Sequence, residues 1–351
     1  MPKIKIIDIA RIAGVSTGTV DRVIHHRSGV SEKTRKYVQD ILEKYDYQPD
    51  ILAGVLASNK SYRFLVCMPE SVNAHEFWKL PLKGVESALE EISIYDVNVD
   101  YLLFDQHSQL DFQKKINDLD CSNYDGLLFA PVFNDLSAKF LQKFDSCGIP
   151  FVLFNSKIEG SIPTSFVGQD SFQSGYLGGR IMSYGLEPGR DLLIVNLSLR
   201  KDNYNHIIKR ERGFRSYFEE HGERVSNLVT LDINAGQYKR VARELESKIE
   251  ELDVAGIFVT NSRVYLVGQY LAERGLMNVR LLGYDLLSRS IDYLNREYID
   301  FLISQSPEEQ AHIGLKTLFN AVVMKQEVIK ENLLPIDILT KENIQYYIKQ
   351  A

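Results

Sequence analysis

The alternation of short apolar runs with amphipathic windows between residues 63 and 285 constrains the fold of this chain most strongly. The runs are rich in Val, Ile, Leu and Phe and have the length of strands, and the windows between them have helical periodicity. Continuous apolar runs are typical of parallel strands that helices cover on both faces. The alternation predicts an α/β body of two doubly wound parallel-sheet lobes rather than one barrel. The runs are FLVCMP (64–69), VNVDYLLF (97–104), YDGLLFAPV (124–132) and IPFVLFN (149–155), then SFVGQD (165–170), DLLIVNLS (191–198), VSNLVTLD (225–232), VAGIFVTN (254–261) and VRLLGYD (279–285).

The segment 286–351 contains a further helix–strand–helix pattern and a final strand near Ile336–Thr340. We expect this segment to cross back between the lobes. The expected division of the body, residues 62–351, is lobe 1 at about 62–165 and 297–325, and lobe 2 at about 166–296 and 326–351.

Polar residues stand at the carboxyl ends of the predicted strands. They are Asn155, Ser198, Asn261, Ser262 and Asp285. Ligands of open parallel sheets bind at this edge, so the pattern predicts a ligand cleft between the two lobes.

The stretch Ile6–His26 contains two short helical patterns on either side of a small-residue break, Gly14-Val15-Ser16. Ser16 is a plausible N-cap for the second helix, whose outward positions are Thr17, Gly18, Asp21, Arg22 and His25. Two helices joined by a short turn with Gly form a helix-turn-helix unit, although any small helical hairpin gives the same pattern. A third helix is expected from Ser31 to about Asp46. The sequence therefore predicts an all-α head at residues 1–48.

Charge favours the DNA-binding interpretation of this head. Residues 1–63 contain more Lys and Arg than Asp and Glu, whereas the whole chain has a formal net charge of −6. A basic head on an acidic body suits a head that meets phosphates. Residues 49–61 are expected to form a linker or hinge helix, too short to be stable alone in water.

The bulk properties are those of an ordinary globular protein of two or three domains, with 351 residues and 44% hydrophobic and 25% charged residues. The start of the chain is unlike a signal peptide, and apolar runs are too short to span a membrane, so we expect a cytoplasmic location. Three scattered cysteines, Cys67, Cys121 and Cys147, favour buried free thiols over a disulfide or a metal site. No cofactor is expected.

Several ordered segments resemble the lac repressor (LacI) family of bacterial transcription regulators over nearly the whole chain. The head carries IIDIARIAGVSTGTVDRVIH, followed by GVSEKTRKYVQDILEKYDYQPD. The body is similar to the family's sensor domain and to ribose-type periplasmic sugar-binding proteins. The matching pieces are FWKLPLKGVESALEE (77–91), DGLLFAP (125–131), IPFVLFN, VGQD (167–170), RERGF (210–214), TNS (260–262), LGYD (282–285) and ISQSPEEQ (303–310).

The resemblance implies a homodimer, or a higher oligomer, that binds a palindromic double-stranded DNA operator and responds to a small carbohydrate effector. It implies DNA contacts by Thr17, Thr19 and Arg22, a phosphate contact near Ser16, and minor-groove insertion by Leu56. The family usually has Ser at the position of Asp21. We expect this carboxylate to pair with Arg22 or Arg11 within the head rather than with a cytosine amine.

For the cleft, the resemblance and the residue types together nominate a set of effector-binding side chains. Arg210 supplies a bidentate donor, Asp285 an acceptor pair, Gln305 a donor and an acceptor, and two aromatic residues the faces for a sugar ring. Alternatives remain: a surface arginine, an N-cap carboxylate, a solvated loop amide and helix-start core aromatics. His75, His107 and His206 are interpreted as loop or surface residues. The set is Phe77, Trp78, Asn155, Arg210, Asn261, Asp285 and Gln305.

An enzyme with a two-lobe cleft is the alternative from another class, and a transport-type sugar-binding protein is a third. The glycines Gly175, Gly178 and Gly179 lie within a helical window and do not form GxGxxG. The sequence also lacks GxxxxGK[ST] and GxSxG. We therefore expect a regulator and not an enzyme.

Overall fold

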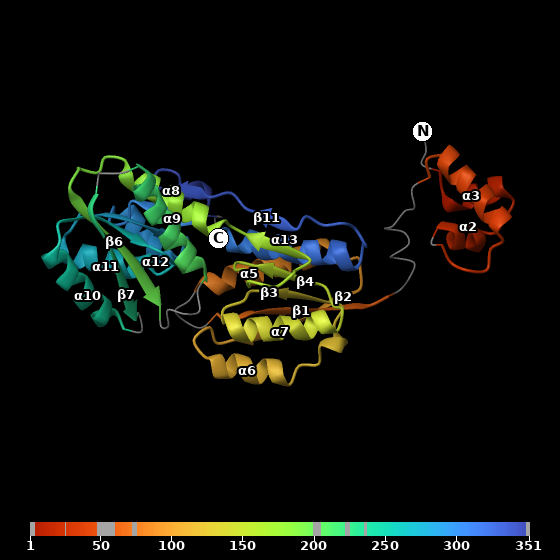
Figure 1. Cartoon of the computed structure of the whole chain (residues 1–351), viewed down its shortest axis with the longest axis horizontal. Helices are drawn as coiled ribbons and strands as arrows, with labels where there is room; N and C mark the ends of the chain where they lie inside the picture. Colours follow the sequence, from red (N-terminus) through yellow and green to blue (C-terminus); the bar gives the residue numbers. More distant parts are fainter. Residues whose placement is uncertain are drawn as a thin grey trace. The chain divides into compact units, whose positions relative to one another are not determined.

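The computed structural model describes residues 4–24, 26–47, 60–71, 76–198, 205–221, 225–234 and 237–348, with the side chains of residues 76 and 198 excepted. The chain forms two compact units, Met1–Lys60 and Ser61–Ala351 (Figure 1). None of the described helices is long and apolar enough to cross a membrane.

The first unit is a three-helix head, composed of α1 (Ile6–Ala13), α2 (Thr17–Ile24) and α3 (Glu32–Lys44). Gly14 ends α1 in the left-handed conformation, at φ 66°, which glycine adopts without steric cost. Ser31 caps α3 by accepting a hydrogen bond from the backbone NH of Thr34. A small apolar core unites the three helices: Ile9, Ala10, Ala13, Val20, Val23, Val38 and Ile41.

The first lobe of the second unit is a six-stranded parallel sheet in the order β11-β5-β4-β3-β1-β2. Helices α6 and α7 cover one face and α5 and α13 the other (Figure 1). The strands are β1 (Tyr62–Pro69), β2 (Val97–Phe104), β3 (Gly126–Phe129), β4 (Phe151–Phe154), β5 (Ser165–Gly168) and β11 (Glu331–Leu333). The helices are η1 (Glu76–Trp78), α5 (Lys79–Glu91), α6 (Gln109–Asn117), η2 (Cys121–Asn123), α7 (Asn134–Ser146) and α13 (Pro307–Val322).

The second lobe has the strand order β12-β10-β9-β8-β6-β7, parallel except for the antiparallel edge strand β12. Its strands are β6 (Arg190–Ser198), β7 (Val225–Asn234), β8 (Val254–Val259), β9 (Arg280–Tyr284), β10 (Phe301–Ser304) and β12 (Asp337–Leu339). Its helices are α8 (Ser171–Ser183), α9 (Asn205–His221), α10 (Tyr238–Glu251), α11 (Val264–Arg274) and α12 (Ser288–Asn295). The short helix η4 (Ile344–Tyr346) follows β12. The two doubly wound lobes predicted from the sequence are therefore present.

The predicted division of the strands between the lobes is wrong at three places. Residues 165–168 form β5 of the first sheet, where they pair with β4, and 331–333 pair with β5 in the same sheet. Residues 301–304 join the second sheet by pairing with β9. Apolar runs look alike in either sheet, because the pairing partner that decides the lobe is distant in sequence.

Gln169 connects the three crossings of the chain between the lobes. It follows β5, is 6% exposed, and donates from Nε2 to the carbonyl oxygens of Ser304 and Pro335, at 2.6 Å each. Ser304 ends β10 before the chain returns to α13 of the first lobe, and Pro335 lies between β11 and β12. One amide group thus holds all three interlobe segments at a single point.

Replacing Gln169 by Ala leaves the carbonyl oxygens of Ser304, which is buried, and of Pro335 without this donor. We expect the free energy of unfolding, measured with urea, to fall by about 1–3 kcal/mol. Gln173→Ala, which changes an exposed glutamine in the first turn of α8, is the matched control. Equal stability of both variants would contradict the role of Gln169 in holding the three interlobe segments together.

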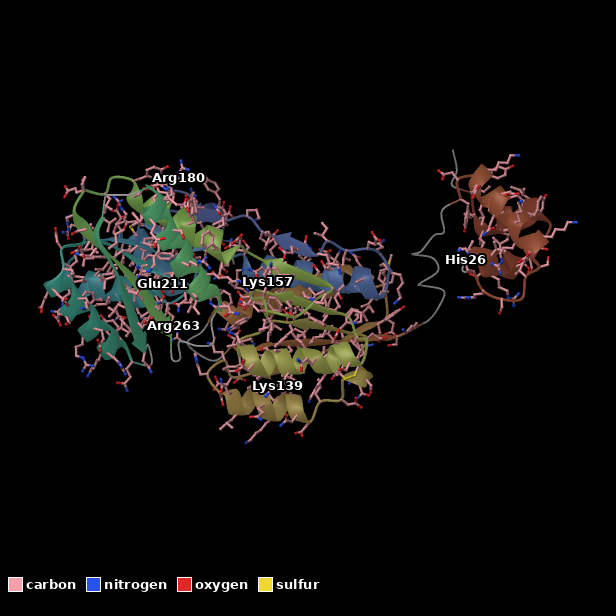
Figure 2. All side chains as sticks on the ribbon, in the orientation of Figure 1. His26, Lys139, Lys157, Arg180, Glu211 and Arg263 are labelled. Atoms are coloured by element: carbon pink, nitrogen blue, oxygen red, sulfur yellow. A yellow bond between two sulfur atoms is a disulfide. The ribbon has the colours of Figure 1, made fainter. Side chains whose placement is uncertain are left out.

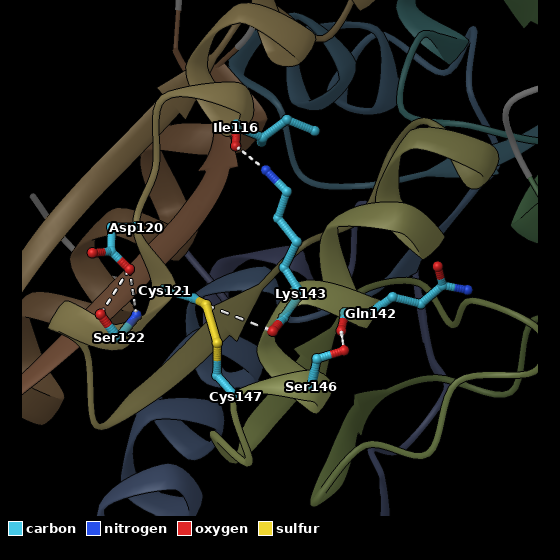
Figure 3. The surroundings of a disulfide bond; sticks show 8 residues. All are labelled: Ile116, Asp120, Cys121, Ser122, Gln142, Lys143, Ser146 and Cys147. Carbon is cyan, nitrogen blue, oxygen red and sulfur yellow. Dashed lines mark hydrogen bonds between the residues drawn. A yellow bond between two sulfur atoms is a disulfide. The ribbon is translucent and has the colours of Figure 1, made fainter.

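The expectation of three free thiols is wrong for two of them. Cys121 and Cys147 form a disulfide, with Cα atoms 7.0 Å apart, between η2 and the end of α7 (Figure 3). Their 26-residue separation in sequence conceals the proximity, which arises from the packing of these elements in the first lobe. Cys67 is a buried free thiol on β1, as expected, and burial raises its pKa well above the ordinary value.

Alkylation of protein purified without reductant tests this thiol assignment. In the folded protein we expect no modification, because Cys67 is fully buried and the other two sulfurs are bonded. Denaturation without reductant should expose one thiol per chain by mass spectrometry, and denaturation with reductant three. Cys67→Ala should remove the single modification, and three modified thiols without reductant would disprove the disulfide.

Candidate functional site: a helix-turn-helix head and an interlobe cleft

The second helix of the head begins as the sequence predicts. The hydroxyl of Ser16 accepts a hydrogen bond from the backbone NH of Thr19 at 3.1 Å and lies 2.9 Å from the Thr19 hydroxyl. Ser16, Thr17 and Arg22 are exposed, whereas Val20 and Val23 on the opposite face of α2 are buried. The exposed N-terminal part of α2 has the form of a recognition helix.

Asp21 makes an ion pair within the head, but with a partner that the sequence did not indicate. Its Oδ2 lies 3.1 Å from Nη1 of Arg27, whereas Arg11 is paired with Asp8 at 3.5 Å. The sequence named Arg22 and Arg11 as partners and missed Arg27, which the turn after α2 brings back towards the helix. The predicted sites His25 and Leu56 and most of the predicted hinge, residues 48–59, lie outside the described residues.

All seven predicted effector-binding residues line one pocket between the lobes. They are Phe77, Trp78, Asn155, Arg210, Asn261, Asp285 and Gln305. Phe77, Trp78 and Asn155 come from the first lobe. The other residues come from the second lobe, except that Gln305 lies in the segment that follows β10. The sequence pattern of polar strand ends therefore located the cleft correctly.

A buried arginine organises the second-lobe side of this cleft. Arg210 on α9 is 2% exposed, so it is not the surface residue that was the alternative. Its Nη1 donates to the carbonyl oxygen of Thr260 at 2.9 Å, and its Nη2 donates to Oε1 of Gln305. The guanidinium carbon lies 3.7 Å from the centre of the Tyr284 ring, a cation–π contact.

Gln305 links Arg210 to the carboxylate of Asp285. Its Nε2 donates to Oδ2 of Asp285 at 2.7 Å, and its main-chain carbonyl oxygen accepts from Nε2 of Gln310 at 2.7 Å. Asp285 does not cap a helix, since the N-cap of α12 is Leu287. Oδ1 of Asp285 and Nε of Arg210 are buried without a hydrogen-bond partner in the structure. This pair of an acceptor and a donor suits neighbouring hydroxyl groups of a ligand.

Burial raises the pKa of Asp285 from its ordinary value of 3.8 to about 6, against the opposing effects of Arg210 and Gln305. Burial and the positive charge of Arg210 lower the pKa of His206 to about 3. At pH 7 the cleft therefore contains an ionised Asp285 and a neutral His206.

Close packing of two helices fixes the backbone of Arg210. A Cβ atom on Gly175 of α8 would lie 2.0 Å from the carbonyl oxygen of Arg210, and one on Gly213 of α9 would lie 2.0 Å from that of Phe172. Side chains at these positions would separate α8 from α9. The glycines of the α8 window thus serve helix packing and not phosphate binding.

Three pairs of side chains join the lobes across the cleft. Nη2 of Arg263 lies 3.3 Å from Nε2 of His107, and Oγ of Ser156 lies 3.2 Å from Nδ1 of His206. The third bond is donated by Nδ2 of Asn134, the first residue of α7, to Oδ1 of Asn205, the first residue of α9, at 3.1 Å. Each of these pairs joins a residue of the first lobe to a residue of the second.

The remaining predicted residues have different local roles. Trp78 is 5% exposed and donates from Nε1 to Oε1 of Gln106 at 3.1 Å, with Phe77 edge-on to it at a centroid distance of 5.0 Å. Asn261 uses its amide to fix the backbone, donating to the carbonyl of Leu197 and accepting from the NH of Arg263.

Sequence reasoning missed several cleft residues. His107 lies in a turn after β2, as expected of a loop residue, whereas His206 lies on α9. Both are partly buried and line the pocket together with Arg263, which follows the end of β8. Figure 2 labels Arg263 on the second lobe. The position of Arg263 just after a strand end was the one available signal. The histidines lacked any such signal, because their neighbours come from the opposite lobe. His75 lies outside the described residues.

Two family models match the chain. Residues 64–326 match the periplasmic binding protein domain, and residues 5–50 match the bacterial regulatory proteins of the lacI family. A solved structure assigned as a LacI transcriptional regulator from Bacteroides fragilis is 31% identical, with a TM-score of 0.75 over 82% of this chain and 100% of that chain. The chain belongs to the LacI family of DNA-binding transcriptional regulators.

Relatives of known name match the chain over different lengths. The sucrose operon repressor of Streptococcus mutans is 22% identical over 97% of this chain and 99% of that protein. Catabolite control protein A of the same species is 31% identical, but the match spans only 46% of each chain, about half its length. A solute-binding protein of Burkholderia graminis solved with D-arabinose, 17% identical with a TM-score of 0.72 over 83% of this chain and 99% of that chain, shares the fold of the sensor domain.

The raised pKa of Asp285 predicts a pH-dependent effect of Asp285→Asn on stability. The folded protein binds more protons at this site than the unfolded chain between about pH 4 and pH 6, so ionisation costs stability as the pH rises through that window. Relative to the wild type, the free energy of unfolding of Asp285→Asn should therefore be higher at pH 7.5 than at pH 4.5, by roughly 1–3 kcal/mol. Urea unfolding at the two pH values measures the difference, and the same offset at both would show that the carboxyl group is not destabilised by burial.

Proposed function

We propose that the protein is a cytoplasmic transcriptional repressor that binds a palindromic operator as a dimer. Its affinity for DNA is set by a small polyhydroxylated, carbohydrate-type effector in the interlobe cleft. The homodimer and the operator are carried over from the family.

One observation carries the effector part of this proposal: the cleft holds a buried network of Arg210, Gln305 and Asp285 with a donor and an acceptor left over. A structural ion pair would use these atoms within the protein. One unused donor and one unused acceptor, in a pocket that Phe77 and Trp78 also line, suit a ring with several hydroxyl groups.

The exposed face of α2 supports the DNA-binding part. Thr17 and Arg22 present a hydroxyl and a guanidinium, groups that contact base edges and phosphates. Asp21 remains half-exposed although it pairs with Arg27, so its charge would also lie near DNA. An enzyme is not favoured, because the named relatives are transcriptional regulators.

Selection of duplexes from a random-sequence pool by the full-length protein tests the DNA-binding part. We expect enrichment of a palindrome whose affinity falls steeply with salt concentration. Arg22→Ala should weaken binding at least tenfold, and Lys36→Ala, which removes an exposed charge from α3, should weaken it less. Binding that is insensitive to salt, or absent, would exclude the regulator function.

Arg210→Ala tests the effector part. This variant should retain its affinity for the selected operator while losing the change in affinity and in melting temperature that the ligand causes in the wild type. Loss of DNA binding without ligand would instead indicate that Arg210 only supports the fold.

A further inference from the structure

The charged side chains among the described residues of the cleft lining do not balance. Arg210 faces the carboxylate of Asp285 through Gln305, so this cation has its counter-charge inside the site. Arg263 is a second arginine in the lining, and its guanidinium is hydrogen-bonded to His107, not to a carboxylate. Asp285 is the single carboxylate among the described residues of the lining. Among the described residues of the lining, two arginines therefore stand against one carboxylate, and the excess positive charge lies at Arg263.

We propose that the effector is an acidic sugar whose single carboxylate or phosphate group binds Arg263, while its hydroxyl groups meet Arg210 and Asp285. This inference rests on the proposed function of the cleft as the effector site.

Desolvation is the first argument for an anion. Arg263 is only partly exposed, and a ligand enclosed between the lobes would remove more of its water. A neutral sugar would leave that charge without a counter-charge, whereas an acid group supplies one together with two acceptor oxygens in the geometry that a guanidinium prefers.

The start of α11 adds to the same field. Arg263 is the N-cap residue of this eleven-residue helix and makes no side-chain capping bond to it. The first backbone NH groups of α11 therefore have no side-chain acceptor from their N-cap residue, and this end of the helix carries the positive end of its dipole.

Asp285 determines where in the cleft the acid group of the ligand can bind. Its buried Oδ1 has no partner and it is ionised at pH 7, so it repels an anion and accepts from a hydroxyl. The acid group is thus excluded from the Asp285 side of the site and directed to Arg263.

Trp78 makes the test direct, because it is the only tryptophan of the chain and it lines the cleft. Its fluorescence in the full-length protein is titrated with matched pairs: D-glucose and D-glucuronate, D-galactose and D-galacturonate. D-gluconate and glucose 6-phosphate separate a carboxylate from a phosphate source. We expect at least one acid to bind with a dissociation constant at least tenfold lower than that of its neutral parent. The affinity for this acid should fall as salt is added.

Arg263→Gln should weaken binding of that acid at least tenfold and bring it to the level of the neutral sugar. Arg289→Gln is the matched control, because it removes the same charge from the same lobe outside the cleft lining and should leave the preference intact. Melting temperatures of both ligand-free variants verify that they fold.

The outcomes separate the two levels of the proposal. Neutral sugars that bind as tightly as their acids, or an Arg263→Gln variant that behaves like Arg289→Gln, overturn the acidic effector while leaving the cleft as the effector site. If no member of the panel changes Trp78 fluorescence or operator affinity, the proposal that the cleft is the effector site is overturned as well.

Discussion

The buried guanidinium of Arg210 is the interaction on which the sensor domain depends. A buried charge is costly unless it is paired and hydrogen-bonded, and Arg210 is hydrogen-bonded through Nη1 and Nη2 while its Nε has no protein partner. Its partners come from the ends of three neighbouring strands: the Thr260 carbonyl after β8, the Tyr284 ring at the end of β9, and Gln305 after β10. The register of this sheet and the close packing of α8 on α9 must therefore both be correct before the site exists. Binding chemistry and folding share the same contacts.

The predictive power of the sequence follows from how local each signal is. Apolar runs and helical windows are local, so the strands and helices of both lobes lie within a few residues of their predicted positions. Polar residues at strand ends are also local, and they identified Asn155, Asn261 and Asp285 as cleft residues. The sheet that receives β10, the ion pair between Asp21 and Arg27, and the Cys121–Cys147 bond depend on where distant or looping segments meet, and no pattern in the chain records that.

The two lobes contribute different kinds of side chain to the cleft. The second lobe supplies the buried network and the charged groups Arg210, Arg263 and Asp285, whereas the first supplies Phe77, Trp78 and small polar side chains. A ligand that enters an open cleft would find its specific polar contacts on the second lobe alone. The first lobe then adds apolar cover and the exclusion of water, which strengthens every electrostatic contact already made.

The free-energy difference between the open and closed arrangements of the lobes is therefore small. The three cross-lobe pairs, of which Asn134–Asn205 is one, join neutral or partly exposed groups, so each contributes about 1 kcal/mol or less. Gln169 holds the crossings at one point, and relative movement of the lobes becomes a rotation about it. Changing the populations of two arrangements from 1:99 to 99:1 takes about 5.5 kcal/mol of differential affinity. Hydroxyl contacts with one lobe alone exist in both arrangements and do not shift their populations. Arg263 of the second lobe is hydrogen-bonded to His107 of the first, so a charged group bound there would act on a pair that joins the lobes. The group that spans the lobes, and not the tightest contact, is the one that can switch the protein.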